Sequence, residues 1–187
     1  MKVILASASP RRRELIKQTG VDFTVIPSDA EEIADRSLPP HIYVERLAEL
    51  KASSVAANVP GTVLGADTVV VFEGEIIGKP SSRECAVKTL KRLSGKCHMV
   101  ITGYCVIYGE NHEKRKVGHA ESKVYFNDLS NEMIEEYVAT GLPMDKAGSY
   151  GVQDGFPIVA KVDGSLSNVI GLPVEDLTEI FKEIANE

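Results

Sequence analysis

The sequence has 187 residues, of which 43% are hydrophobic, and its formal net charge at pH 7 is -6. This length suffices for one sizeable hydrophobic core and is short for two independent ones, so we expect a single domain over residues 1–187. The acidic balance excludes general binding to nucleic acid or to an anionic membrane surface, because such proteins carry a basic excess that meets phosphates. A phosphate ligand must therefore be met by local clusters of basic side chains.

Short apolar runs alternate with amphipathic stretches along the chain. The first run, Val3–Leu5, predicts a strand, and the helix after it extends from Pro10 to Gly20 with Ser9 as its N-cap. The other expected strands are 23–26, 63–64, 69–72, 76–77, 99–108, 122–126 and 158–162. The other expected helices are 40–58, 81–95, 130–140 and one that begins near Pro173. Because several adjacent strands are joined by short turns, we expect an α/β fold with a mixed sheet flanked by helices.

The cysteines and the start of the chain bear on the cellular compartment. Cys85, Cys97 and Cys105 are odd in number and lack a C-x-x-C pair, so neither a disulfide framework nor a zinc site is indicated. The apolar run from Val3 to Ala6 is too short for a signal-peptide core, and no other stretch approaches transmembrane length. These features predict a protein of the reducing cytoplasm.

The segment Ser7–Arg13 lies where a strand ends and a helix begins. Backbone N–H groups, the positive end of the helix and serine hydroxyls converge there, and the adjacent arginines suit a polyphosphate. Cations in the first turn of a helix lower its stability unless an anion binds. A solvated basic turn is the structural alternative, and the residues alone leave both interpretations open.

Asp67 interrupts an otherwise apolar strand pattern. A lone carboxylate in such a place is paired, bound to a metal or exposed in a cleft. The alternative is that the strand ends at Gly65 and that Asp67 caps a turn.

Two lysines and two glutamates are further candidates. Lys51 lies on the apolar stripe of its helix, so it either extends past the edge of the core or points into a cleft beside anions. Lys79 lies on a tight turn, where it contacts a phosphate or stays solvated, and its spacing is not that of a Walker motif. Glu31 and Glu32 supply the carboxylates that magnesium prefers, or they form a solvated acidic loop.

A set of segments, ordered along nearly the whole chain, resembles the Maf family of nucleotide pyrophosphatases. The segments are SASPRR, ERLAELKA, GADTVV, GKP, LSGKCHMVITG, YVATGLPMDKAGSYGVQ and IVAKVDGSLSNVIGLPVE. No single segment is decisive, but the ordered set is highly specific. The resemblance implies a fold like that of Maf and inosine triphosphatase-like proteins, with two lobes around a central cleft. It also implies a homodimer.

The resemblance implies that the bond between the α and β phosphates of a nucleoside triphosphate is hydrolysed with a divalent metal, Mg²⁺ or Mn²⁺. In that picture Asp67 is the proton acceptor, and Glu32 together with Asp67 holds the metal. The positions expected to face phosphate are Ser9, Arg11, Arg12, Lys51 and Lys79. This division is chemically sensible, because a metal and a general base produce hydroxide while cations stabilise charge on phosphate oxygens.

A branch of the family associated with dTTP and UTP is similar to this sequence at the positions that set base preference. The matching residues are Arg11, Thr68 and Gln153. Gln153 has the paired donor and acceptor that a pyrimidine edge needs. The sequence departs from the usual family pattern at Leu142, Ser149 and Asp154, and Asp154 borders the expected base-recognition loop.

Two other functions compete with hydrolysis. A nucleotide-binding regulator of cell division is one, since the family is also linked to septum formation, and it predicts binding with little turnover. A nucleotidyltransferase is another, and it would need an acceptor. Asp67 among cationic side chains favours the enzyme, because a pure sensor does not require a carboxylate that activates water.

Overall fold

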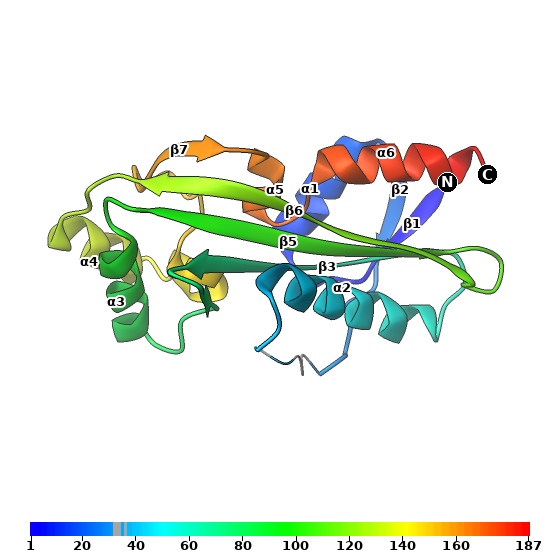
Figure 1. Ribbon diagram of the computed structural model, residues 1–187, viewed down its shortest axis with the longest axis horizontal. Coiled ribbons are helices and arrows are strands. Elements are labelled where there is room, and N and C mark those ends of the chain that lie inside the picture. The colour runs from blue at the N-terminus through cyan, green and yellow to red at the C-terminus, as the bar shows by residue number, and fades with distance from the viewer. Residues whose placement is uncertain (32–34, 36) are drawn as a thin grey trace. The chain divides into compact units, whose positions relative to one another are not determined.

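The computed structural model describes residues 1–31, 35 and 37–187 (Figure 1). The chain divides into two compact units. Unit 1 comprises Met1–Thr68, Thr102–Ala120 and Gly171–Glu187, and unit 2 comprises Val69–Ile101 and Glu121–Ile170. The prediction of two lobes is confirmed, and the central cleft stays a prediction.

The strands form a mixed sheet. They are β1 (Lys2–Leu5), β2 (Asp22–Val25), β3 (Thr62–Phe72), β4 (Glu75–Ile77), β5 (Cys97–Tyr108), β6 (Lys114–Phe126) and β7 (Val159–Asp163). Hydrogen-bonded neighbours of this seven-stranded sheet follow the order β2-β1-β3-β5-β6-β7, and β4 pairs with β3. β1 is parallel to β2 and β3, whereas the β3–β4 and β6–β7 pairs are antiparallel. The predicted α/β class with a mixed sheet is therefore confirmed.

The helices of unit 1 begin and end where local signals predict. They are α1 (Pro10–Ile16), the 3-10 helix η1 (Lys17–Thr19), α2 (Pro40–Ala56) and α6 (Val174–Ala185). Ser9 caps α1, Pro10 occupies its first turn, and Gly20 ends η1 with a left-handed φ of 76°. α2 buries its apolar stripe in a core shared with β1, β3 and β5.

Unit 2 is built around a second core. Its helices are α3 (Arg83–Leu93), α4 (Asn131–Ala139), the 3-10 helices η2 (Leu142–Asp145) and η3 (Ala147–Ser149), and α5 (Leu166–Ile170). Ser82 caps α3 and Ser130 caps α4, close to the predicted helix starts at residues 81 and 130. Leu90, Leu93 and Tyr137 are fully buried in this core. None of the helices in the described part of the chain is long and apolar enough to cross a membrane.

Some element predictions are wrong. The apolar pattern breaks at 65–68, but β3 continues through it, because Gly65 and Asp67 face α2 rather than leaving the sheet. β6 begins at Lys114, well before the predicted start, since its first half is largely polar and lacks apolar alternation. α5 was not predicted, and its five residues are too few for a helical period to register.

Candidate active site

Asp67 lies within β3 and is 9% exposed, although its neighbours along the strand are mostly apolar. The Lys51 ammonium of α2 donates to Asp67 Oδ1 at 2.6 Å. The two side chains are 11% and 13% exposed, so this is a nearly buried ion pair. Each charge offsets the desolvation penalty of the other. Of the alternatives open from sequence, Asp67 is paired within the strand and does not cap a turn.

Gly65 allows α2 to lie close enough to β3 for this pair to form. Residues 65 and 67 share one face of the strand, because side chains alternate along it. A Cβ at Gly65 would lie 2.2 Å from the backbone oxygen of Ala48 and 2.7 Å from the backbone nitrogen of Ala52. Any side chain at this glycine would push the helix, and with it Lys51, away from Asp67.

Thr68 points to the opposite face of β3 and joins a network around the Arg12 guanidinium. Arg12 Nη2 donates to Thr68 Oγ1 at 3.0 Å, and Thr68 Oγ1 lies 2.9 Å from Thr102 Oγ1. Arg12 Nε donates to the backbone oxygen of Gly171 at 2.8 Å, and Nη1 donates to Ser7 Oγ at 3.4 Å. Arg12 is therefore held from several segments of unit 1 and is not part of a solvated basic turn.

Ser9 and Arg11 lie at the start of α1. The Ser9 hydroxyl accepts from the backbone N–H of Arg12 at 3.4 Å, and the Ser9 N–H donates to Ser7 Oγ at 3.2 Å. The first turn of α1 contains no acidic residue, and Arg11 is half-buried beside it. The positive helix end is thus accompanied by further positive charge, which an anion complements.

Lys79 and Gln153 are exposed residues of unit 2. Lys79 follows β4, and Gln153 lies in the loop that follows η3. The backbone N–H of Gly148 in η3 donates to the backbone oxygen of Gly78 at 3.2 Å. The turn that bears Lys79 is therefore fastened to the start of the segment that bears Gln153.

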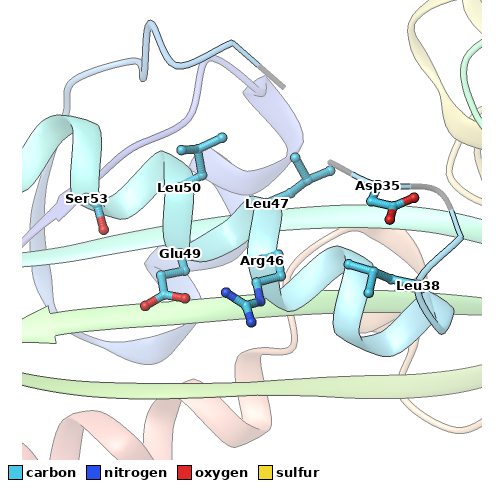
Figure 2. A pocket seen from close by; sticks show the side chains of 7 residues that line it. All are labelled: Asp35, Leu38, Arg46, Leu47, Glu49, Leu50 and Ser53. Carbon is cyan, nitrogen blue, oxygen red and sulfur yellow. The ribbon is translucent and has the colours of Figure 1, made fainter. Parts of the chain in front are cut away.

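Unit 1 has a pocket on the exposed side of α2, with a volume of about 540 Å³ (Figure 2). Its lining residues are Asp35, Leu38, Arg46, Leu47, Glu49, Leu50 and Ser53. None of the described residues that the sequence predicts for catalysis or phosphate binding lines it. Neither Lys51 nor Asp67 is among its lining residues.

Comparison with known proteins decides the family. The model of the family described as Maf-like protein matches residues 2–184. The chain belongs to the Maf family. The dTTP/UTP pyrophosphatase of Moorella thermoacetica is 49% identical to it over 185 residues, which cover 96% of this chain and 95% of that protein. The dTTP/UTP pyrophosphatase of Thermococcus gammatolerans is 47% identical, with coverage of 92% and 91%.

Solved structures that resemble this Maf chain support its fold. The Ham1 protein of Staphylococcus aureus has a TM-score of 0.57 and 16% identity, and the match covers 98% of this chain and 100% of that one. The HAM1 protein from Coxiella burnetii has a TM-score of 0.52 and 14% identity, with coverage of 98% and 99%. At this level of identity the likeness concerns the fold alone.

The residues predicted for the Maf site fall into separate groups. Unit 1 contains Ser9, Arg11, Arg12, Lys51, Asp67 and Thr68, unit 2 contains Lys79 and Gln153, and Glu32 lies outside the described residues. Sequence reasoning missed Thr102 and the backbone of Gly171, which complete the Arg12 network. Thr102 carried a usable signal, because it is a polar residue within the apolar run of β5 and is fully buried.

The donor set for a metal in the described residues is sparse. No group of three or more His, Cys, Asp or Glu side chains in that part of the chain is arranged to hold an ion. Magnesium is nevertheless commonly bound through one or two carboxylates, with waters and substrate phosphates completing its shell. The Asp67 carboxylate fits that role, since it is an oxygen donor that lies beside one cation suited to phosphate, the Lys51 ammonium.

Proposed function

We propose that this Maf protein hydrolyses dTTP and UTP to the nucleoside monophosphate and pyrophosphate. The observation that carries the proposal is the nearly buried Lys51–Asp67 pair, with its 2.6 Å contact, in a chain 49% identical to a dTTP/UTP pyrophosphatase. The regulator of cell division is not favoured, because relatives matching almost the whole chain are named as pyrophosphatases.

Asp67 is the general base in this proposal. It accepts a proton from a water molecule that attacks the α phosphorus, and the bond to the β phosphate breaks as pyrophosphate leaves. Lys51 orients the Asp67 carboxylate through a charge-assisted hydrogen bond and provides a cation for the phosphates. A buried, oriented base needs little rearrangement when the substrate arrives.

Basic residues and a metal bind the triphosphate in this proposal. The phosphate-facing residues are Ser9, Arg11, Arg12, Lys51 and Lys79. Asp67 and Glu32 would hold Mg²⁺ or Mn²⁺, which would neutralise phosphate charge and make water a better nucleophile.

Base preference is assigned to Arg11, Thr68 and Gln153. The contact from Arg12 Nη2 to Thr68 Oγ1 supports adding Arg12 to this set, because Thr68 and Arg12 form one hydrogen-bonded unit. A side chain that orients Thr68 also limits which base edge Thr68 can contact.

We also propose that residues 1–187 function as one domain, which forms a homodimer in the cytoplasm. The match of the family model to residues 2–184 supports one functional domain that includes both compact units. Light scattering coupled to gel filtration tests the dimer, and a mass of one chain would contradict it.

The activity is tested with dTTP, UTP, dATP and dGTP in the presence of Mg²⁺ or Mn²⁺. Released pyrophosphate is converted to phosphate by added pyrophosphatase and measured. We expect turnover of dTTP and UTP above that of the purine nucleotides. Binding of dTTP without turnover would support the regulator, and turnover only with an added acceptor would support the transferase.

A further inference from the structure

A cluster of buried polar side chains in unit 2 is not used in the chemistry proposed above. Tyr137 is fully buried, Lys146 is 7% exposed, and the Asp154 side chain is 6% exposed. The Tyr137 hydroxyl donates to Asp154 Oδ2 at 2.5 Å, and Lys146 Nζ lies 3.3 Å from the same oxygen. Such a carboxylate is buried without a large penalty only because both partners are present.

The same cluster fastens the segment between α4 and Gln153. Tyr137 belongs to α4, and its hydroxyl oxygen accepts from the backbone N–H of Gly151 at 2.9 Å. Lys146 Nζ also donates to the backbone oxygen of Leu142 at 2.5 Å. The loop is thus tied at its start through Lys146 and near its end through Gly151 and Asp154.

The Tyr137 hydroxyl acts as a donor toward Asp154 and as an acceptor toward Gly151. Burial, and then the bond to Asp154, raise the pKa of Tyr137, so its hydroxyl keeps its proton. That single proton is donated to Asp154, and the oxygen lone pairs remain to accept from Gly151. A buried polar network whose members are satisfied makes the structure around it more rigid.

Gly151 lies against the side chains of the cluster. A Cβ at this residue would lie 2.7 Å from Asp154 Oδ1 and 2.7 Å from Lys146 Cε. The glycine therefore lets the ion pair lie directly against the backbone just before Gln153. The Lys146–Asp154 pair and the backbone conformation at Gly151 therefore depend on each other.

Gln153 is exposed and lies between residues that the network holds, Gly151 and Asp154. Resting on the pyrophosphatase function above, we propose that Asp154, held by Tyr137 and Lys146, is a positioning residue that orients Gln153 and thereby sets base selectivity. Asp154 does not contact the reacting atoms in this proposal. Its effect on the substrate passes through the Gln153 amide.

A double-mutant cycle between Gln153→Ala and Asp154→Ala tests the proposal. KM and kcat are measured for dTTP and dGTP, together with the affinity for a non-hydrolysable α,β-methylene analogue of dTTP. Asp154→Ala should raise KM for dTTP about tenfold, the effect of one lost hydrogen bond, with a much smaller change in kcat. In the Gln153→Ala background the same change should have less than about a twofold effect, because the residue it positions is gone.

Milder variants keep the proposal testable if Asp154→Ala does not fold. Asp154→Asn still accepts from Tyr137 and should recover much of the selectivity, whereas Tyr137→Phe should lose it. Asp145→Asn is the matched control, since Asp145 pairs with the same lysine at 3.1 Å but its side chain is 58% exposed. It should leave KM for dTTP unchanged.

The outcomes separate the inference from the proposed function. Two outcomes would overturn the positioning role while leaving the pyrophosphatase function intact. One is that the effects of Gln153→Ala and Asp154→Ala on KM multiply in the double variant. The other is that Asp154→Ala raises KM equally for dTTP and dGTP. If the wild-type protein binds the analogue without turnover, the proposed function fails and the cycle is read from the affinities alone. Absence of nucleotide binding would overturn both.

Discussion

Each compact unit contains a nearly buried lysine–aspartate pair, and the two pairs differ in the number of donor groups that lie against the carboxylate. Asp154 in unit 2 receives the Tyr137 hydroxyl and the Lys146 ammonium on the same oxygen. Asp67 in unit 1 receives the Lys51 ammonium, which is its hydrogen-bond donor among the described residues. A carboxylate has about four lone-pair sites, so Asp67 retains acceptor capacity for a water or a metal. In the proposals above, similar burial of the same residue types serves chemistry in unit 1 and loop geometry in unit 2.

Neutralising each aspartate in turn gives the largest expected contrast. Asp67→Asn removes the proposed base, so kcat with dTTP should fall by about 10²- to 10⁴-fold while analogue binding is retained. Asp154→Asn should change kcat by less than about threefold, because that carboxylate takes no proton from the substrate water. Equal losses of kcat in the two variants would contradict the assignment of the base to Asp67 alone.

Removing the lysine of the unit 1 pair should lower stability as well as activity. Lys51→Met leaves the nearly buried Asp67 charge without its partner, and unfolding in urea should show a loss of about 3 kcal/mol. Adding Asp67→Asn to this variant should recover part of that loss, since no charge then stays uncompensated. A double variant less stable than Lys51→Met would contradict the ion-pair account.

Unit 2 should be the more sensitive unit to mild acid because of His98. Its Nε2 lies 2.8 Å from the Tyr150 hydroxyl, and burial lowers the pKa of His98 to about 4. As pH falls below the ordinary pKa of histidine, His98 takes up a proton in the unfolded chain before it does so in the folded protein. The contribution of neutral His98 to the free energy of unfolding is therefore complete near neutral pH and is lost as pH falls toward 4. Between pH 7 and pH 5, the free energy of unfolding of His98→Gln should fall by about 2 kcal/mol less than that of the wild type. Identical pH profiles for the two proteins would show that His98 does not titrate on unfolding.

The smallest expected effect compares the Tyr137 hydroxyl, which has two hydrogen-bond partners in unit 2, with the Tyr108 hydroxyl, which donates to Glu187. Tyr137→Phe removes a donor to Asp154 and an acceptor for Gly151, and should lower the free energy of unfolding by about 1 to 2 kcal/mol. Tyr108→Phe is the matched control, because that hydroxyl donates to Glu187 near the chain end and should contribute less than about 0.5 kcal/mol. Thermal unfolding of both variants checks the difference.

Local signals in the sequence predicted much of the fold. The N-caps at Ser9, Ser82 and Ser130 and the stop at Gly20 depend on hydrogen bonds within a few residues, so the sequence carries them directly. The false break in β3 has the opposite origin. Gly65 is selected by the approach of α2, a helix elsewhere in the sequence, and not by the strand's own periodicity.

The site was less predictable than the fold for the same physical reason. Asp67 and Lys51 each stood out as a charge in an apolar pattern, although nothing local specified that they pair. The contacts of Arg12 with Thr68 and Gly171 join residues 56 and 159 positions apart, beyond the reach of any periodic pattern. In the sequence, Asp154 differs from the usual family residue, but nothing there indicates its partners. The structure shows that they are Tyr137 and Lys146.

Turnover of dTTP in ¹⁸O-labelled water tests the central claim most directly. Attack of water on the α phosphorus, with Asp67 accepting the proton, predicts one labelled oxygen in the monophosphate and none in the pyrophosphate. Label in the pyrophosphate, or no cleavage without an added acceptor, would contradict this account.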